Sequence, residues 1–196
     1  ARIERISRAA QSNVRMIYHY FGGKEKLYLV VLENAYRTIR TLEQRIAFHT
    51  KEPLEGMRQL IELTFDYLST DPFFVRLMMN ENLMMGRMAR KSKRIPDMTR
   101  PLVEALEKLL HRGQDEGVFH GQVNSVHLYV AILGLCFIHI SNRFTLSIML
   151  QTDIADPKWL DERKRIVTNI LMTYLTTGHW HEESEPHRRE LLGAPA

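Results

Sequence analysis

Residues 13–27 read NVRMIYHYFGGKEKL, and the interpretation of the whole chain starts from this stretch. Asn13 is placed to cap a helix, because its side-chain oxygen accepts from backbone N–H groups left free in a first turn. The helix ends after eight residues at Gly22-Gly23, where left-handed backbone carries no steric penalty. Its spacing turns Ile17 and Phe21 inward and leaves the other side to Arg15, Met16, Tyr18 and His19. A short capped helix with this polar, cationic face suits a DNA groove.

Two stretches resemble the TetR family of transcriptional regulators. Residues 17–27, IYHYFGGKEKL, are similar to the signature that closes that family's helix-turn-helix, and residues 3–10, IERISRAA, resemble the motif's first helix. The resemblance covers roughly the first quarter of the chain. It implies an all-α fold, with an N-terminal helix-turn-helix domain and a larger helical domain for ligand binding and dimerisation. The implied function is a repressor released from a palindromic operator by a small-molecule inducer.

The chain departs from the family pattern at the turn of the motif and at its beginning. The family usually has Gly where this chain has Gln11, and a small apolar residue at Ser12. Gln11 would need either a turn with negative φ or a strained one. The family also has a helix before the motif, which this chain starts too late to contain, so we expect a portion of a longer chain.

The residues expected at DNA divide by role. Asn13, Val14, Arg15 and Met16 are candidates for base edges, since Arg donates two hydrogen bonds to guanine and apolar groups contact the thymine methyl. Tyr18, His19, Tyr20 and Lys24 suit phosphates, which fix register. The resemblance implies backbone contacts for Tyr18 and Lys24. Two alternatives stay open: Tyr20 as a partly core residue and His19 as a solvated one.

Composition indicates an ordinary globular protein. The 196 residues are 44% hydrophobic and 26% charged, with room for one large domain or two smaller ones. The single cysteine, Cys136, excludes an intrachain disulfide and fits the cytoplasm. The apolar run 128–140 is shorter than the ~20 residues of a membrane span, so no membrane is expected. Residues 1–50 hold nine Lys and Arg against four Glu, although the whole chain has a net charge of only +4. This basic surplus favours phosphate binding by the N-terminal part.

Helical periodicity continues to about residue 178. We expect helices over 24–49, 54–69, 72–86, from between Pro96 and Pro101 to about Gly113, over 124–150, and over 157–177, followed by a poorly ordered tail at 179–196. The domains are therefore predicted as 1–48, with the start of the connecting helix, and 49–178. The 24–49 helix is predicted to bury Leu27, Val30, Val31, Asn34, Ile39, Leu42 and Ile46.

The helix over 124–150 is apolar nearly all round, so its own domain cannot cover it entirely. Paired with the 157–177 helix it would form a four-helix homodimer interface across a two-fold axis. The resemblance implies the same arrangement. The alternative is a helix buried inside a large monomer.

Methionines next to aromatic and polar residues predict an adaptable ligand chamber, although core packing is the commoner explanation for any one of them. The expected ligand-binding residues are Ile61, Phe65, Met78, Met79, Asn82, Phe137, His139 and Asn142. His139 is alternatively an interface histidine.

The sequence offers little support for a metal site or a catalytic site. His179, His181 and His187 lack metal-site spacing, and Glu81 has no nucleophile or phosphate loop to accompany it. We therefore expect no catalytic residues, no metal and no cofactor. The basic segment 87–94 is interpreted as a solvated turn, with a nucleic-acid patch as the alternative. The competing function is a helical ligand- or partner-binding module without operator-specific DNA binding.

Overall fold

The computed structural model describes residues 2–46 and 48–177, and these residues fold into α-helices joined by turns. The expected tail at 179–196 lies outside them. The elements are α1 (Ile3–Ala9), α2 (Val14–Phe21), α3 (Lys24–Glu43), α4 (Pro53–Thr70), α5 (Pro72–Leu83), the 3-10 helix η1 (Ala89–Lys91), α6 (Arg94–Asp115), α7 (Ser125–Ser141), α8 (Arg143–Leu150) and α9 (Pro157–Thr176). The predicted all-α class is confirmed.

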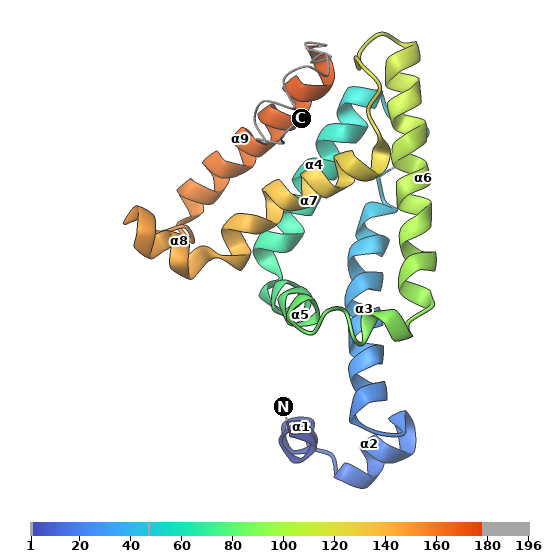
Figure 1. Ribbon diagram of the computed structural model, residues 1–196, viewed down its shortest axis with the longest axis vertical. Coiled ribbons are helices and arrows are strands. Elements are labelled where there is room, and N and C mark those ends of the chain that lie inside the picture. Colours follow the sequence, from blue (N-terminus) through green and yellow to red (C-terminus); the bar gives the residue numbers. More distant parts are fainter. Residues whose placement is uncertain (1, 47, 178–196) are drawn as a thin grey trace, which may run out of the picture.

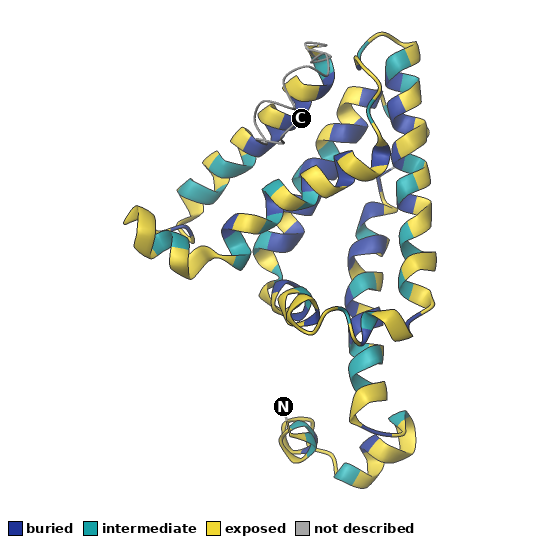
Figure 2. Cartoon of the chain, viewed as in Figure 1, coloured by how far each residue is buried: buried dark blue, intermediate teal, exposed yellow. Residues whose placement is uncertain are grey.

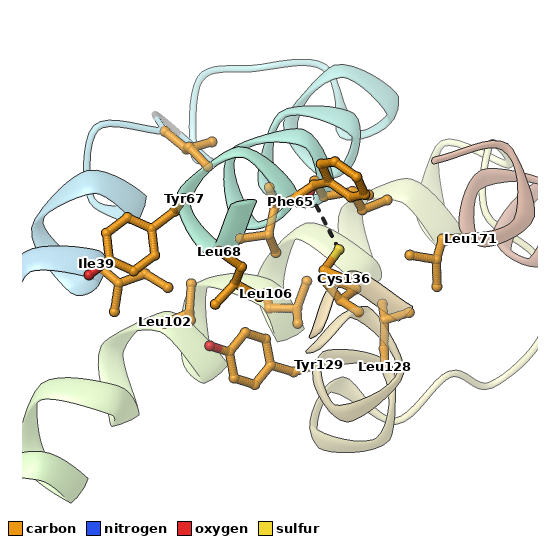
Figure 3. Close-up of a cluster of buried hydrophobic side chains, with 14 of the residues drawn as sticks. Ile39, Phe65, Tyr67, Leu68, Leu102, Leu106, Leu128, Tyr129, Cys136 and Leu171 are labelled. Carbon is orange, nitrogen blue, oxygen red and sulfur yellow. Dashed lines mark hydrogen bonds between the residues drawn. The ribbon is translucent and has the colours of Figure 1, made fainter. Parts of the chain in front are cut away.

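The helices separate into a small end and a larger body (Figure 1). Helices α1 and α2 lie at the small end, and α3 runs from them into the body. Helix α4 is at the centre of the body, in contact with α3, α5, α6, α7 and α9. Figure 3 shows the core between these helices, where Phe65, Leu106 and Cys136 are fully or almost fully buried.

Helix α3 is shorter than predicted, and two of its seven predicted inward residues face solvent. It ends at Glu43, because the chain then turns and folds Ile46 and Phe48 into the core. Val30 and Asn34 are exposed, whereas Leu32 and Ala35 are buried. The buried positions follow the series 32, 35, 39 and 43, whose three- and four-residue steps keep one helical stripe toward the body.

Side-chain caps set the predicted starts of α5 and α9. Asp71 accepts from the backbone N–H groups of Phe73 and Phe74, and Asp156 accepts from that of Trp159. In both cases proline is the first helical residue, where its missing N–H is not needed. Helix α5 stops at Leu83 and not at Gly86, because Met85 and Gly86 both have left-handed backbone, with φ of 53° and 68°.

Helix α6 begins at Arg94, before either of its prolines, and so earlier than expected. Pro96 falls in the first turn, where no intrahelical N–H bond is required. Pro101 lies inside the helix, and its ring occupies the position of one backbone donor.

The predicted 124–150 helix is two helices. Asn124 caps α7, which ends at Ser141, and α8 starts again at Arg143 after a bend of 71°. No single helix in the described chain is long and apolar enough to cross a bilayer, although α7 and α8 together reach that length and composition. Helix α8 has no buried residue and projects from the body (Figure 2).

Candidate nucleic-acid interface

The turn between α1 and α2 places Gln11 in left-handed backbone, with φ of 48°. The N–H of Ser12 donates to the carbonyl of Ser7 at 2.9 Å, which closes the turn. A side chain on this backbone is strained, since only glycine adopts it without cost. The sequence left two geometries open at Gln11, and the structure has the strained one.

Helix α2 has the predicted caps. The Asn13 side-chain oxygen accepts from the Met16 N–H at 2.9 Å, and the helix ends at Gly22, with φ of 70°. Ile17 is buried against the rest of the small end, and Phe21 is half-buried. The cap at each end and the buried Ile17 fix the orientation of the other side of the helix.

That other side of α2 is presented to solvent. Arg15, Met16 and His19 are exposed, as is Tyr18, and the Tyr20 side chain is 69% exposed, so Tyr20 is not a core residue. Lys24 is exposed at the start of α3, and Val14 is half-buried. The Asn13 oxygen is used by the cap, which leaves its amide N–H groups to donate. The eight predicted DNA contacts thus lie on one short helix and its two flanks.

Aromatic contacts support this surface. The rings of His19 and Tyr20 meet edge to face, with centroids 5.2 Å apart. The Tyr18 ring lies beside Gly23, where an added Cβ would be 3.5 Å from the ring. Tyr18 is therefore steadied by backbone while its hydroxyl remains available to a phosphate.

The basic segment 87–94 is bound to α3, which neither sequence-based interpretation included. Glu25 pairs with Arg87 at 3.3 Å and with Lys91 at 2.8 Å. Farther along α3, Glu33 accepts from the Ser92 hydroxyl at 2.7 Å and from Arg94 at 3.1 Å. We call residues 87–94 the basic strap. Charge counts alone could not identify this pairing, because the two glutamates lie about 60 residues before their partners.

Glu81, considered as an acid–base candidate, has a structural role. It is buried, and one of its carboxylate oxygens accepts from the backbone N–H groups of Met88 and Ala89 at 3.1 and 2.9 Å. These bonds anchor α5 to the start of the basic strap.

The predicted ligand residues fall into separate groups. Ile61 and Phe65 are core residues of α4, and the Phe65 ring stacks on His139 of α7 at 4.9 Å, with Trp159 close by. Phe137 is half-buried on α7, and Asn142 is exposed at the α7–α8 bend. On α5, Met78 is half-buried and Met79 and Asn82 are exposed. The ring contacts thus join Phe65 to His139, and Met78 packs against the same hydrophobic core from α5.

His139 is an unusual member of that set. Its side chain is 2% exposed, and neither ring nitrogen has a hydrogen-bond partner within the described chain. Burial, together with the nearby Arg163 guanidinium, lowers the pKa of His139 to about 4. The ring is therefore neutral near pH 7.

A cavity of about 650 Å³ lies elsewhere, and none of the eight predicted ligand residues lines it. It is bounded by the last turn of α3, the segment 44–49 and α6. No sequence pattern indicates this cavity, because its walls come together only when α3 packs on α6.

Metal ligands do not gather in the part of the chain that the structure describes, where no group of three or more His, Cys, Asp or Glu could hold an ion. His179, His181 and His187 lie beyond residue 177 and outside that part. Cys136 is buried, and burial raises the pKa of its thiol to about 12. This thiol packs as a small apolar side chain.

Comparison with known proteins gives consistent matches. Residues 53–171 match the family model described as the tetracyclin repressor-like C-terminal domain. The chain is 39% identical over 155 residues to the HTH-type transcriptional repressor NicS of Pseudomonas putida, which covers 79% of this chain and 73% of that protein.

Solved structures of similar shape include the ketosteroid transcriptional regulator KstR2 of Mycobacterium tuberculosis, with 17% identity, a TM-score of 0.66 and coverage of 90% of this chain and 85% of that one. A TetR transcriptional regulator from Streptomyces coelicolor, SCO0520, gives 18% identity, a TM-score of 0.52 and coverage of 90% and 89%. At these identities the structures show a shared fold alone.

Proposed function

This chain belongs to the TetR family of transcriptional regulators, and from that membership we propose that it acts as a homodimer on a near-palindromic operator and leaves it when a small molecule binds. The family and its 39% identical relative make it a TetR-like DNA-binding repressor. TetR-family repressors bind DNA operators and form dimers. A protein that represses transcription works beside the chromosome, so we place it in the cytoplasm, and we assign it no enzymatic activity.

The outward side of α2 is the observation that carries this proposal. Arg15 and Met16, with Asn13 and Val14 at the helix start, are proposed to contact base edges in a major groove. Tyr18, His19, Tyr20 and Lys24 are proposed to contact phosphates on either side of it. The exposure of every one of these residues except the half-buried Val14, and the two fixed ends of α2, support these roles.

We propose that the dimer forms through α7 and α9, with α8 at the edge. Along α7, Val126, Val130 and Ile138 form an exposed apolar row with Gly134, and α9 exposes Ile166 and Ile170. A Cβ on Gly134 would have no heavy atom within 4 Å, so a partner helix can approach the backbone there. We call α2 the reader helix, or reader. Two readers related by such a two-fold axis would enter successive major grooves ~34–36 Å apart.

Release by an inducer follows from the role of α3, which joins the reader to the body. A ligand with different affinities for two positions of α3 shifts the readers out of that spacing, and its effect cannot exceed the affinity difference. The predicted residues Met78, Met79 and Asn82 of α5 and the Phe65–His139 pair remain one proposed location for this ligand. The α3–α6 cavity is another.

A DNA-binding experiment tests the function. The protein is titrated into labelled DNA from immediately upstream of its own gene and into a shuffled duplex of equal length and composition. We expect tighter binding to the upstream DNA, as two protomers per site. Equal affinity for both duplexes, from a protein shown to be dimeric, would instead favour the module without operator-specific binding.

A further inference from the structure

The cavity between α3 and α6 has the volume of a small-molecule site. It measures about 650 Å³, within the range of roughly 300–1,000 Å³ that ligand pockets occupy. It is bounded on one side by Glu43 and Ile46, at and after the end of α3, and on the other by Leu102 and Leu109 of α6. One of its two walls is therefore α3, the helix that also carries α2.

The wall of the cavity is mainly apolar. Ile46, Phe48, Leu102 and Leu109 line it and are buried, and Ala105 lies between the two leucines on α6. Such a wall favours a ligand with a ring or another apolar body.

The two guanidinium groups that line the cavity already have acceptors. Arg112 donates to the backbone carbonyls of Phe48 and Lys51 at 2.7 and 2.8 Å, which fixes the segment after α3. Arg40 donates to Glu43 at 2.7 Å and to the Tyr129 hydroxyl at 2.7 Å. A carboxylate ligand would therefore have to displace existing bonds to reach either arginine.

Carboxyl oxygens, in contrast, are left over. Glu43 is 1% exposed, and its Oε1 has no hydrogen-bond partner within the described chain. Glu104 and Asp115 also line the cavity, and neither forms an ion pair among the described residues. With Glu43 paired to Arg40, the charged groups of the lining without an ion pair among the described residues are two carboxylates, Glu104 and Asp115, and one ammonium, that of Lys108.

Burial of the Glu43 carboxyl shifts its pKa. It raises the pKa of Glu43 to about 7, although the Arg40 guanidinium and the neighbouring Tyr129 hydroxyl act in the opposite direction. A second cation near this carboxyl would satisfy its free oxygen and favour the ionised form.

We propose that the α3–α6 cavity binds an organic amine with an apolar ring, whose protonated nitrogen pairs with Glu43 while Glu104 and Asp115 add negative potential at the rim. The apolar wall holds the ring, and the surplus of carboxyl oxygens selects amines over acids. That occupancy also releases DNA is a consequence that rests on the proposed function, because a ligand between α3 and α6 favours positions in which the two helices stand apart.

The test uses tryptamine and indole-3-propionate, which share a ring and differ in charge, in calorimetric titrations of the whole protein without DNA. We expect saturable binding of tryptamine and at least roughly tenfold weaker binding of indole-3-propionate, equivalent to ~1.4 kcal/mol. Glu43→Gln should weaken tryptamine binding by about the same factor. Glu107→Gln, which removes a carboxylate from the same helix but outside the cavity, is the matched control and should leave binding unchanged.

A second variant protects the test against misfolding of Glu43→Gln. Ala105→Trp fills the cavity from a half-buried position without altering any charged group, and should abolish tryptamine binding in a protein with unchanged helical content. The proposal is overturned by equal or tighter binding of indole-3-propionate, by tryptamine binding that survives both variants, or by no saturable binding up to the solubility of tryptamine. Tryptamine that binds as expected and leaves operator affinity unchanged would overturn the release step and support the site.

Discussion

The Glu33 carboxylate of α3 accepts a 2.7 Å hydrogen bond from the Ser92 hydroxyl of the basic strap, and both side chains are buried. Glu33 lies nine residues after Lys24 in α3, and its bond to Ser92 holds α3 to the body at that position. Glu25, nearer the reader, pairs with the same strap but at the surface. The two glutamates thus make similar contacts in different surroundings.

Because Glu33 is buried and Glu25 is exposed, their removal should change the free energy of unfolding by different amounts. Glu33→Ala leaves the Ser92 hydroxyl without its acceptor, so we expect a loss of about 2 kcal/mol in the free energy of unfolding by urea. Glu25→Ala removes only exposed ion pairs and should leave that free energy unchanged. Similar losses from both substitutions would contradict this account of the strap.

Gln11 predicts a stabilising substitution. Gln11→Gly removes the left-handed strain of about 1–2 kcal/mol and adds a smaller entropic cost, so we expect the unfolding free energy to rise by about 0.5–1 kcal/mol. Gln151 has nearly the same φ, 50°, at the end of α8, and serves as the control. Gln151→Gly should stabilise similarly without changing operator affinity, whereas Gln11→Gly alters the turn that positions α2. A destabilised Gln11→Gly protein would show that the glutamine side chain itself is required.

His139 predicts a pH dependence. Its pKa is about 4 when folded and about 6.5 when unfolded, so between these values the unfolded chain binds more protons. The corresponding stability is present above pH 6.5 and is lost as the pH falls through 4, by roughly 3 kcal/mol in total. His139→Leu should remove this loss. The measurement is the free energy of urea unfolding of the variant and of the unsubstituted protein, compared at pH values from 7 to 4. Exposed His111→Leu is the control, and it should run parallel to the native curve.

The proposed interface predicts that a charge on α7 separates the protomers. Val130 is 60% exposed in the apolar row, and Val130→Glu should weaken dimerisation by at least roughly tenfold in analytical ultracentrifugation. Leu83 at the end of α5 is 82% exposed and matches it in character. Leu83→Glu should leave the dimer intact; dissociation caused by this variant instead would move the interface to α5.

The division of DNA contacts predicts two different defects. Lys24→Ala should weaken binding to every duplex. It should also reduce the slope of log affinity against log salt concentration by about one, as for the loss of one phosphate contact. Arg15→Ala should cost roughly 1–3 kcal/mol at particular base pairs, with the salt dependence less affected. Anisotropy titrations over several salt concentrations and single-base operator variants distinguish them. Uniform loss on all DNA from both variants would contradict the assigned roles.

Local chemistry explains which features could be predicted from the sequence. The caps at Asn13, Asp71 and Asp156 each involve backbone groups within three residues, so a short stretch contains all that determines them. The reader helix was predictable for the same reason. Its contacts with DNA, like the ligand residues, remain predictions.

Features that depend on distant residues were missed. The inward face of α3 was wrong at Val30 and Asn34, because burial there is set by packing against α4 and α6. The bend at Asn142 carries no proline or glycine to signal it. The basic strap and the α3–α6 cavity join segments about 60 residues apart, and periodicity contains no information on such pairs.

The buried Glu33–Ser92 bond ties α3 to the basic strap at a point between the reader and the cavity. At a rise of about 1.5 Å per residue, Lys24 at the reader end lies about 13 Å along the helix from Glu33. Arg40, at the cavity end, lies about 10 Å from Glu33 in the other direction. If α3 turned as a rigid rod about this bond under the proposed release, a displacement of about 1 Å at Arg40 would carry Lys24 about 1.3 Å the other way. In the proposed dimer the two protomers would move symmetrically, so a widening at the cavity end would change the separation of the two α2 helices by about twice the shift at one of them.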